Sequence, residues 1–216
     1  MEKKLTVAPI IIALEKSFDI LNEKLYDGKL KRPVITLCEG AKVRAMGWFT
    51  VGEVWHDLEG ESACELNIAS DYLKRSFEDI VKTLAHEMIH ACNYAEGVQD
   101  CARSGSRHNK KFKECAEAHG MHWIKPAEDD VMMQEYYKKY GYSDVDLNDD
   151  LKESIYQELQ FLKEALTMYR DKAEKGEKKK SNNVIKYICP VCGASCRATK
   201  ELHLICGECN MPMEIG

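Results

Sequence analysis

The stretch SFEDIVKTLAHEMIHACNYA, residues 76–95, says most about the fold of this chain and about the chemistry it could carry out. Its apolar residues Ile80, Leu84 and Met88 recur at the helical period, which predicts an amphipathic helix with one face in a core. Ser76 stands where an N-cap is preferred, because its hydroxyl can accept a hydrogen bond from the first turn. We therefore predict a helix over residues 76–95.

Two histidines within this helix, His86 and His90, are four positions apart and so project from the same face. Two neutral imidazoles at that spacing can hold a zinc ion, while Glu87 between them reaches water activated there without binding the metal. We predict a catalytic Zn²⁺ with His86 and His90 as ligands and Glu87 as general base. The alternative is a pair of ordinary helix-face histidines beside a solvated Glu87, which would place two polar rings next to the core stripe of the helix.

A catalytic zinc needs a third protein ligand and one open position. We predict His108, because it opens a second helical stretch after a loop rich in Gly, Ser, Asp and Asn that can turn back towards His90. Other candidates follow closely in the sequence and stay open: His119, His122, Glu114 and Glu117.

Two C-x-x-C pairs near the C-terminus form a second metal signature, comprising Cys189, Cys192, Cys206 and Cys209. Each pair makes a tight knuckle, Gly193 and Gly207 permit the turns, and residues 194–205 can form a hairpin between the knuckles. Four thiolates close the coordination sphere, so we predict one structural Zn²⁺ in a module too small to fold well without it. A redox dithiol or a disulfide pair is the alternative.

The remaining segments predict an α+β fold. A first helix ends near Gly28, and extended segments at 33–38, 45–51 and 64–69 predict a small antiparallel sheet before the metal helix. The strand at 64–69 could hold a substrate as an added strand, or be an ordinary internal strand. Residues 129–140 and 149–175 read as helices. This order predicts a metal-binding domain, a helical insert, a polar linker and a zinc ribbon at residues 1–127, 128–173, 174–185 and 186–216.

Composition points to a reducing compartment. The six cysteines outside the C-x-x-C pairs show no disulfide-like spacing, and several fall on predicted core faces. No apolar run is long enough to cross a membrane, and the basic, apolar start of the chain is followed by no small-residue cleavage site. We expect a cytoplasmic monomer without membrane contact.

Charge is unevenly distributed along the chain. Residues 172–216 hold eight Lys or Arg against five Asp or Glu, whereas the preceding part is acidic enough to bring the net charge to −5. The acidic body will not attract nucleic acid, but the basic linker and ribbon could contact DNA phosphates.

The motifs together resemble the SprT-like family, which includes the Spartan DNA-dependent proteases. The resemblance rests on HEMIHA at 86–91, His108 with Phe112, the CPVC and CGEC pairs, LNEKLYDGKL at 21–30, Gly47-Trp48 and LNIAS at 66–70. It implies a zincin-like metallopeptidase domain with the three histidines as ligands and Glu87 as base. For the Spartan branch it further implies cleavage of proteins crosslinked to DNA. The family usually has His-Gly where this chain has His108-Asn109, and Asn tolerates positive φ better than most residues.

The predicted function is therefore that of a zinc metalloendopeptidase acting on protein substrates, with DNA-associated or DNA-crosslinked proteins as the substrate class. One alternative is a nucleic-acid-binding adaptor whose zincin domain is inactive. Another is a zinc amidase that acts on small substrates.

Overall fold

The computed structural model describes residues 5–40, 45–102, 105–171 and 184–216. The chain divides into two compact units, Met1–Lys172 and Ala173–Gly216. The first unit has a mixed α+β architecture, as the sequence predicts, and the second is a small three-stranded sheet. Within the described ranges, none of the helices combines the length and the apolar character needed to cross a membrane.

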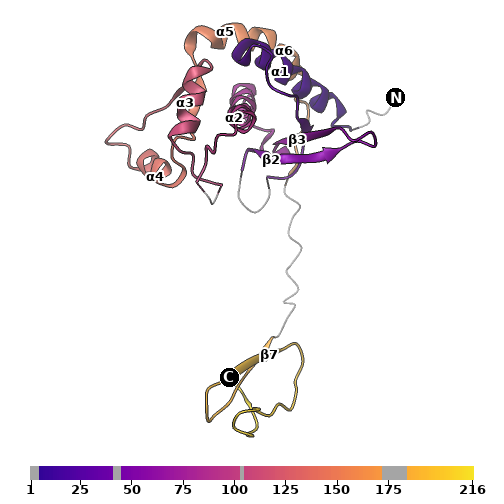
Figure 1. Ribbon diagram of the computed structural model, residues 1–216, viewed down its shortest axis with the longest axis vertical. Helices are drawn as coiled ribbons and strands as arrows, with labels where there is room; N and C mark the ends of the chain where they lie inside the picture. The colour runs from indigo at the N-terminus through magenta and orange to yellow at the C-terminus, as the bar shows by residue number, and fades with distance from the viewer. Residues whose placement is uncertain (1–4, 41–44, 103–104, 172–183) are drawn as a thin grey trace. The chain divides into compact units, whose positions relative to one another are not determined.

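The first helix, α1 (Ala8–Tyr26), supplies one wall of the core of the first unit. Leu14, Phe18 and Leu21, which share one face at the helical period, are fully buried. The apolar start of the chain is therefore the beginning of a packed helix in this structure. α1 lies beside α5 (Asp149–Glu158) and α6 (Gln160–Ala165), on one side of the central helix α2 (Phe77–Ala95; Figure 1).

The three-stranded sheet of the first unit is mixed, which corrects the expected antiparallel sheet. β2 (Gly47–His56) pairs antiparallel with β3 (Ser62–Ile68), whereas β1 (Val34–Thr36) pairs parallel with the opposite edge of β3. The chain crosses from β1 to β2 before it turns back into β3, so β1 and β3 run in the same direction. β3 is therefore the central strand, with both of its edges occupied over Glu65, Leu66 and Asn67.

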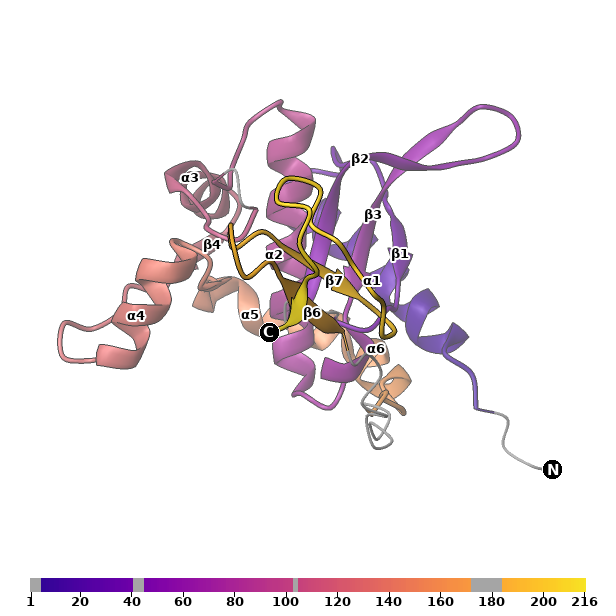
Figure 2. The same cartoon turned by 90° about the horizontal axis from the view of Figure 1, so that it is seen from below.

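The central helix α2 (Phe77–Ala95) confirms the helix predicted over residues 76–95. Ser76 caps it, because its hydroxyl accepts a hydrogen bond from the Asp79 N–H at 3.1 Å. Ile80, Leu84 and Met88 are fully buried. α2 runs between the sheet and α3 (Lys110–Ala118), which Figure 2 shows clearly. The sheet and α3 thus lie on opposite sides of the helix that carries the histidine pair.

A small two-stranded sheet, for which the sequence shows no signal, joins the end of α3 to the helical insert. β4 (Met121–Trp123) pairs antiparallel with β5 (Val145–Leu147). Between them lies α4 (Val131–Tyr140), which corresponds to the helix predicted at 129–140. The pairing brings the chain after α4 back to α2, where Lys82 and Asp144 form an ion pair at 2.8 Å.

The long helix predicted at 149–175 is instead two short helices, α5 and α6. The break falls at Leu159, whose carbonyl accepts from the Leu162 N–H, three residues on, at 2.9 Å. α6 ends at Ala165 because the following residues bind elsewhere: the Arg170 N–H donates to the Ser70 carbonyl at 3.1 Å, and the Arg170 side chain pairs with Glu39. The last part of the predicted helix, residues 172–175, lies outside the described residues.

The second unit contains β6 (Ile185–Ile188), β7 (Ser195–Ala198) and β8 (Glu214–Ile215), all antiparallel, in the order β7-β6-β8. The hairpin is formed by β6 and β7, around the first C-x-x-C pair, and not within residues 194–205 as the sequence suggested. Residues 174–183 of the predicted linker lie outside the described residues.

Candidate metal centre

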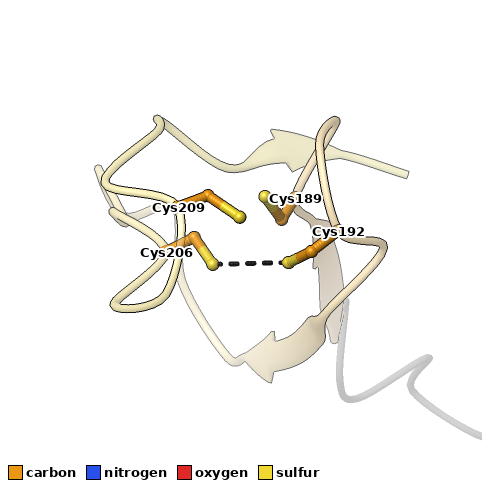
Figure 3. A group of neighbouring side chains, drawn as sticks. All are labelled: Cys189, Cys192, Cys206 and Cys209. Carbon is orange, nitrogen blue, oxygen red and sulfur yellow. Dashed lines mark hydrogen bonds between the residues drawn. The ribbon is translucent and has the colours of Figure 1, made fainter.

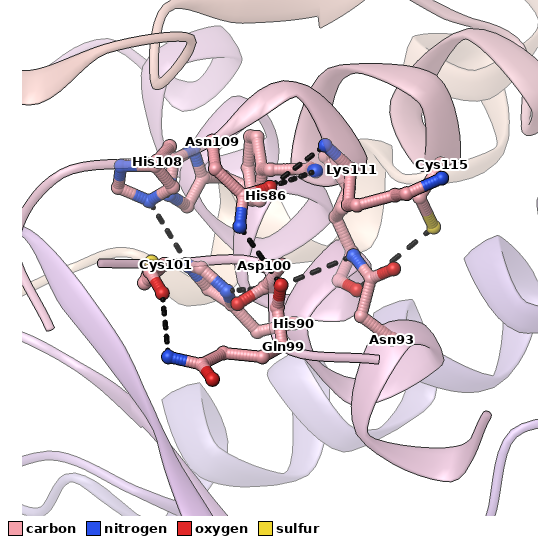
Figure 4. A network of polar contacts seen from close by, with 12 residues as sticks. His86, His90, Asn93, Gln99, Asp100, Cys101, His108, Asn109, Lys111 and Cys115 are labelled. Atoms are coloured by element: carbon pink, nitrogen blue, oxygen red, sulfur yellow. Dashed lines mark hydrogen bonds and ion pairs between the residues drawn. The ribbon is translucent and has the colours of Figure 1, made fainter. Parts of the chain in front are cut away.

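Three imidazoles meet on the surface of α2 that faces α3. Nε2 of His108 lies 3.1 Å from Nε2 of His86 and 3.1 Å from Nε2 of His90 (Figure 4). A tetrahedral zinc ion with Zn–N distances of about 2.0–2.1 Å separates two ligand nitrogens by about 3.3 Å, so the observed spacing fits a common ion. The structure thus brings the three predicted ligand residues together.

On the side away from the cluster, each imidazole ring contacts a hydrogen-bond acceptor. His90 Nδ1 lies 2.7 Å from the Asp100 carboxylate, and His108 Nδ1 lies 3.2 Å from the Tyr140 carbonyl oxygen. The His86 ring donates to the backbone of Ser143. Such contacts fix the hydrogen on the outer side of each imidazole and leave the Nε2 lone pairs pointing at one another. Lone pairs gathered in this way repel one another unless a cation lies between them.

The electrostatics of His86 and His108 also favour neutral rings. Burial lowers the pKa of His86 well below its ordinary value, and the neighbouring His108 and His90 lower it further. Burial, followed by His90, lowers the pKa of His108 to about 4. For His90, burial lowers the pKa, but the hydrogen bond to Asp100 and the charge of Glu87 outweigh that effect, so the pKa is raised overall. Neutral imidazole is the form that binds a metal.

Phe112 packs against all three imidazole rings of the cluster. It is fully buried, and its ring centroid lies 4.4 Å from that of His108, 4.8 Å from that of His86 and 4.9 Å from that of His90. His108 stands directly before the N-cap of α3 and Phe112 lies in its first turn, so one short segment supplies both a candidate ligand and the apolar surface that all three rings contact.

Glu87 lies on the side of α2 that faces β2. Its side chain is buried, and the Phe49 N–H of β2 donates to its carboxylate. Burial raises the pKa of Glu87 to about 7, although His90 and the Phe49 N–H lower it. Gly47 makes room for this carboxylate, since a Cβ there would stand 2.9 Å from the Asn67 carbonyl oxygen and 3.1 Å from Glu87 Oε1.

The other candidates for a third ligand lie elsewhere. His119 Nδ1 is 2.8 Å from the Leu25 carbonyl oxygen, and His122 Nδ1 is 3.2 Å from the Asn148 side-chain oxygen. The two glutamates form surface ion pairs with lysines of the same helix: Glu114 with Lys110 and Lys111, and Glu117 with Lys113. Of these candidates, only His108 joins His86 and His90.

Three features of the site were missed from the sequence. Asp100 holds His90, and the carbonyls of Tyr140 and Ser143 hold the other rings. Asp100 stands in a loop without periodicity, so the sequence gives no signal for its role beyond its residue type. The two backbone contacts come from residues 32 or more positions after His108, and depend on the β4–β5 pairing that returns the chain to α2.

Asn109 does not adopt the positive φ that the comparison with a His-Gly pair suggested. Its φ is −93°, and it is the N-cap of α3: its side-chain oxygen accepts from the Lys111 N–H at 2.7 Å, while its amide donates to the Gln99 carbonyl at 2.8 Å. Asn109 therefore ties the start of α3 to the loop that carries Asp100.

Position 108 is also fixed by its backbone. The His108 N–H donates to the Tyr140 carbonyl at 2.9 Å, and the Tyr142 N–H donates to the His108 carbonyl at 3.2 Å. Gly141 lies between these contacts with φ of +66°, and a Cβ there would overlap the His108 carbonyl oxygen. Only glycine permits this close approach without strain.

The four cysteines of the second unit form another candidate metal site. The sulfur atoms of Cys189, Cys192, Cys206 and Cys209 point toward one another (Figure 3) and lie within 4.8 Å of one another. The Cys192 and Cys206 sulfurs are 3.6 Å apart. Zn–S distances of about 2.3 Å separate two ligand sulfurs by about 3.8 Å in a tetrahedron, so this cluster is also compatible with zinc.

The two knuckles use different residues for their turns. Gly193 has φ of +73°, as expected for the first knuckle, but the left-handed residue of the second is Asn210 (φ +48°) and not Gly207. Backbone N–H groups of Cys192 and Val191 lower the pKa of Cys189 to about 7, which favours the thiolate that a metal binds.

A sequence model of the SprT-like family matches residues 14–130, more than half of the chain. The matched segment spans most of α1, the three-stranded sheet, α2 and α3, so it contains every residue of the histidine cluster. Neither the comparison with curated proteins nor that with solved structures found a match. The chain belongs to the SprT-like family.

Proposed function

We propose that this protein is a zinc-dependent metalloendopeptidase with a zincin-like catalytic domain. The observation that carries the proposal is the meeting of the His86, His90 and His108 Nε2 atoms, each ring held from behind by an acceptor, beside the buried carboxylate of Glu87. Membership in the SprT-like family, which is generally metallopeptidase-like, supports it.

The three imidazoles would hold the catalytic zinc, and Asp100 would keep His90 in its binding tautomer. Zinc bound there supplies Lewis-acid polarisation of a water molecule and of the scissile carbonyl. Glu87 accepts the proton of the attacking water and passes it to the departing amine nitrogen. The hydrogen bond from the Phe49 N–H orients the Glu87 carboxylate on the side of α2 that faces β2, and the absence of a side chain at Gly47 leaves room for it there.

The substrate would bind as an extended strand along β2. The sequence pointed to residues 64–69 for this role, but β3 has a neighbour on each edge. Within the described residues, β2 has β3 on one edge only, and its Phe49 contacts the proposed base. Main-chain hydrogen bonds along a strand edge give binding with little selectivity for side chains.

DNA-associated or DNA-crosslinked proteins are the proposed substrate class, with the linker and ribbon as the DNA-contacting part. The charge that supports this lies mostly in the linker: the ribbon itself balances Lys186, Arg197 and Lys200 against three glutamates. The ribbon holds the second, structural zinc in this proposal. The proposed compartment is the cytoplasm, where a reducing environment suits cysteines that bind metal or stay as thiols; none of the ten, all in the described part of the chain, forms a disulfide.

The test is proteolysis of an unfolded protein such as casein by zinc-loaded chain, with and without single-stranded DNA. Glu87→Gln should abolish cleavage while zinc content stays unchanged, because the carboxylate acts on water and does not bind the metal. Glu78→Gln, on the exposed side of the first turn of α2, is the matched control and should cleave as the wild type does. Cleavage by clean Glu87→Gln protein would refute the role of the base.

The same assay separates the alternatives. DNA binding with no cleavage of casein or of the chain itself under any condition would favour the adaptor. Intact casein together with turnover of small amides would favour the amidase. Stimulation of casein cleavage by single-stranded DNA would support the DNA-associated substrate class.

A further inference from the structure

A second cluster of metal-binding side chains lies within the first unit, apart from the three histidines. Cys92, near the end of α2, Cys115 of α3 and His119, which follows α3, place their ligand atoms within 4.8 Å of one another. Cys92 and Cys115 share a side-chain hydrogen bond. Neither thiol has a role in the proposed hydrolysis.

The distances suit a thiophilic cation. Cys92 Sγ lies 3.6 Å from His119 Nε2. A tetrahedral zinc ion with Zn–S of about 2.3 Å and Zn–N of about 2.0–2.1 Å separates its sulfur and nitrogen ligands by about 3.6 Å. The spacing therefore fits two ligands of one ion, and without an ion the same two atoms form a hydrogen bond.

His119 is oriented as a metal-binding histidine would be. Its Nδ1 lies 2.8 Å from the Leu25 carbonyl oxygen, so Nδ1 carries the hydrogen and Nε2 presents its lone pair to Cys92. A backbone carbonyl behind the ring is a common outer contact of a metal-binding imidazole. The same arrangement holds His108 in the catalytic cluster.

The buried hydroxyl of Tyr26 independently indicates that this cluster binds a further group. Its ring packs on His119 with centroids 4.4 Å apart, and its hydroxyl is buried with no hydrogen-bond partner among the described residues. Buried hydroxyl groups are normally satisfied. Burial raises the pKa of Tyr26, and the nearby thiols of Cys115 and Cys92 raise it further, which places the phenol beside the cluster.

We propose that Cys92, Cys115 and His119 bind a structural zinc ion, with the Tyr26 hydroxyl or a water as the fourth ligand. Each thiol loses its proton as it binds, so uptake of one zinc ion releases two protons. Cys92 and Tyr26 are almost fully buried, while Cys115 and His119 are partly exposed and leave a route for the ion. The site would join the ends of α1 and α2 to α3, the helix that carries Phe112.

The test counts zinc in the full-length chain. Cys115→Ser and His119→Gln should each lose one zinc per chain relative to wild type, whereas Cys38→Ser, at an exposed thiol of the same unit, should lose none. His108→Ala separately removes the catalytic ion, so failure of that site and failure of this one are distinguishable. Wild-type zinc content in both Cys115→Ser and His119→Gln would overturn the proposal.

A second measurement uses the wild-type chain and does not depend on how the variants fold. Added zinc should protect Cys115 from alkylation, while Cys38 is modified at the same rate with and without the metal. Equal modification of Cys115 in both conditions would contradict the site. So would a Cys92–Cys115 disulfide in chain purified with zinc and without reductant.

Discussion

The Asp100 carboxylate lies 2.7 Å from Nδ1 of His90 and also accepts a hydrogen bond from the Asn93 side chain at 3.2 Å. The hydrogen bond to His90 and the charge of that ring lower the pKa of Asp100 despite its burial. The carboxylate is therefore ionised at neutral pH, and it fixes both the orientation and the tautomer of a candidate zinc ligand.

Asp100→Ala should weaken zinc binding at the histidine cluster by roughly 10–100-fold, because loss of an outer partner of a ligand histidine has effects of that size. Competition with a chelator, followed by metal analysis, measures the change. Asp150→Ala, at an exposed position of α5, should bind zinc as the wild type does. Equal zinc affinity of the Asp100 and Asp150 variants would mean that Asp100 does not support His90.

Gly141→Ala should displace His108, because the new Cβ would overlap the His108 carbonyl oxygen. We expect loss of the zinc ion bound by the histidines and a lower thermal midpoint. Gly97→Ala is a close control: Gly97 has φ of +68°, against +66° at Gly141, but its added Cβ meets nothing within 4 Å. Both substitutions carry the cost of a positive φ, so only the difference between them reports the contact with His108.

Leu162→Ala should destabilise the first unit by about 2–5 kcal/mol, since it removes a fully buried side chain and leaves a cavity. Urea unfolding of the full chain measures the free energy of unfolding of this unit. Leu58→Ala removes an equal number of atoms from a fully exposed residue and should have almost no effect. Equal stability of the two variants would show that α6 does not belong to the core.

Zinc in the ribbon should protect its four cysteines from alkylation, while the exposed Cys196 of the same unit reacts. A chelator should make all five reactive. Hydrogen bonds from the backbone hold the pKa of the Cys189 thiol at about 7, below its ordinary value, so the free thiolate is present above that pH. Protons compete with zinc for this thiolate, so the apparent zinc affinity of the ribbon should fall as the pH drops below about 7. Modification of Cys189 as fast as Cys196 in zinc-loaded chain would contradict a ribbon site.

The local features were predictable from the sequence because periodicity and capping are local. The helix over 76–95, its Ser76 cap and the common face of His86 and His90 follow from spacing alone. His108 was predicted as the third ligand from its place between a loop and a helical stretch, but spacing alone left His119 open, since the choice depends on how the loop after α2 folds back. Membership in the SprT-like family was also predictable, because its motifs can be identified in the sequence by their residue types and spacing.

The features that depend on distant contacts could not be predicted. The parallel pairing of β1 with β3 and the pairing of β4 with β5 are set by partners far along the chain. The same holds for Asp100, whose role depends on its position behind His90 and not on any pattern around it. Asn109 was misjudged because a family difference suggested a left-handed turn, whereas its side chain caps α3.

The packing of α6 against α1 has a consequence for how the protein forms during its synthesis. Leu14, near the start of the chain, and Leu162 belong to the same core cluster. Closing a loop of about 150 residues carries an entropy cost that must be met before these side chains can touch. Almost the whole first unit must therefore emerge from the ribosome before its core can form. Until then we expect the three histidines to lack a fixed arrangement in the nascent polypeptide.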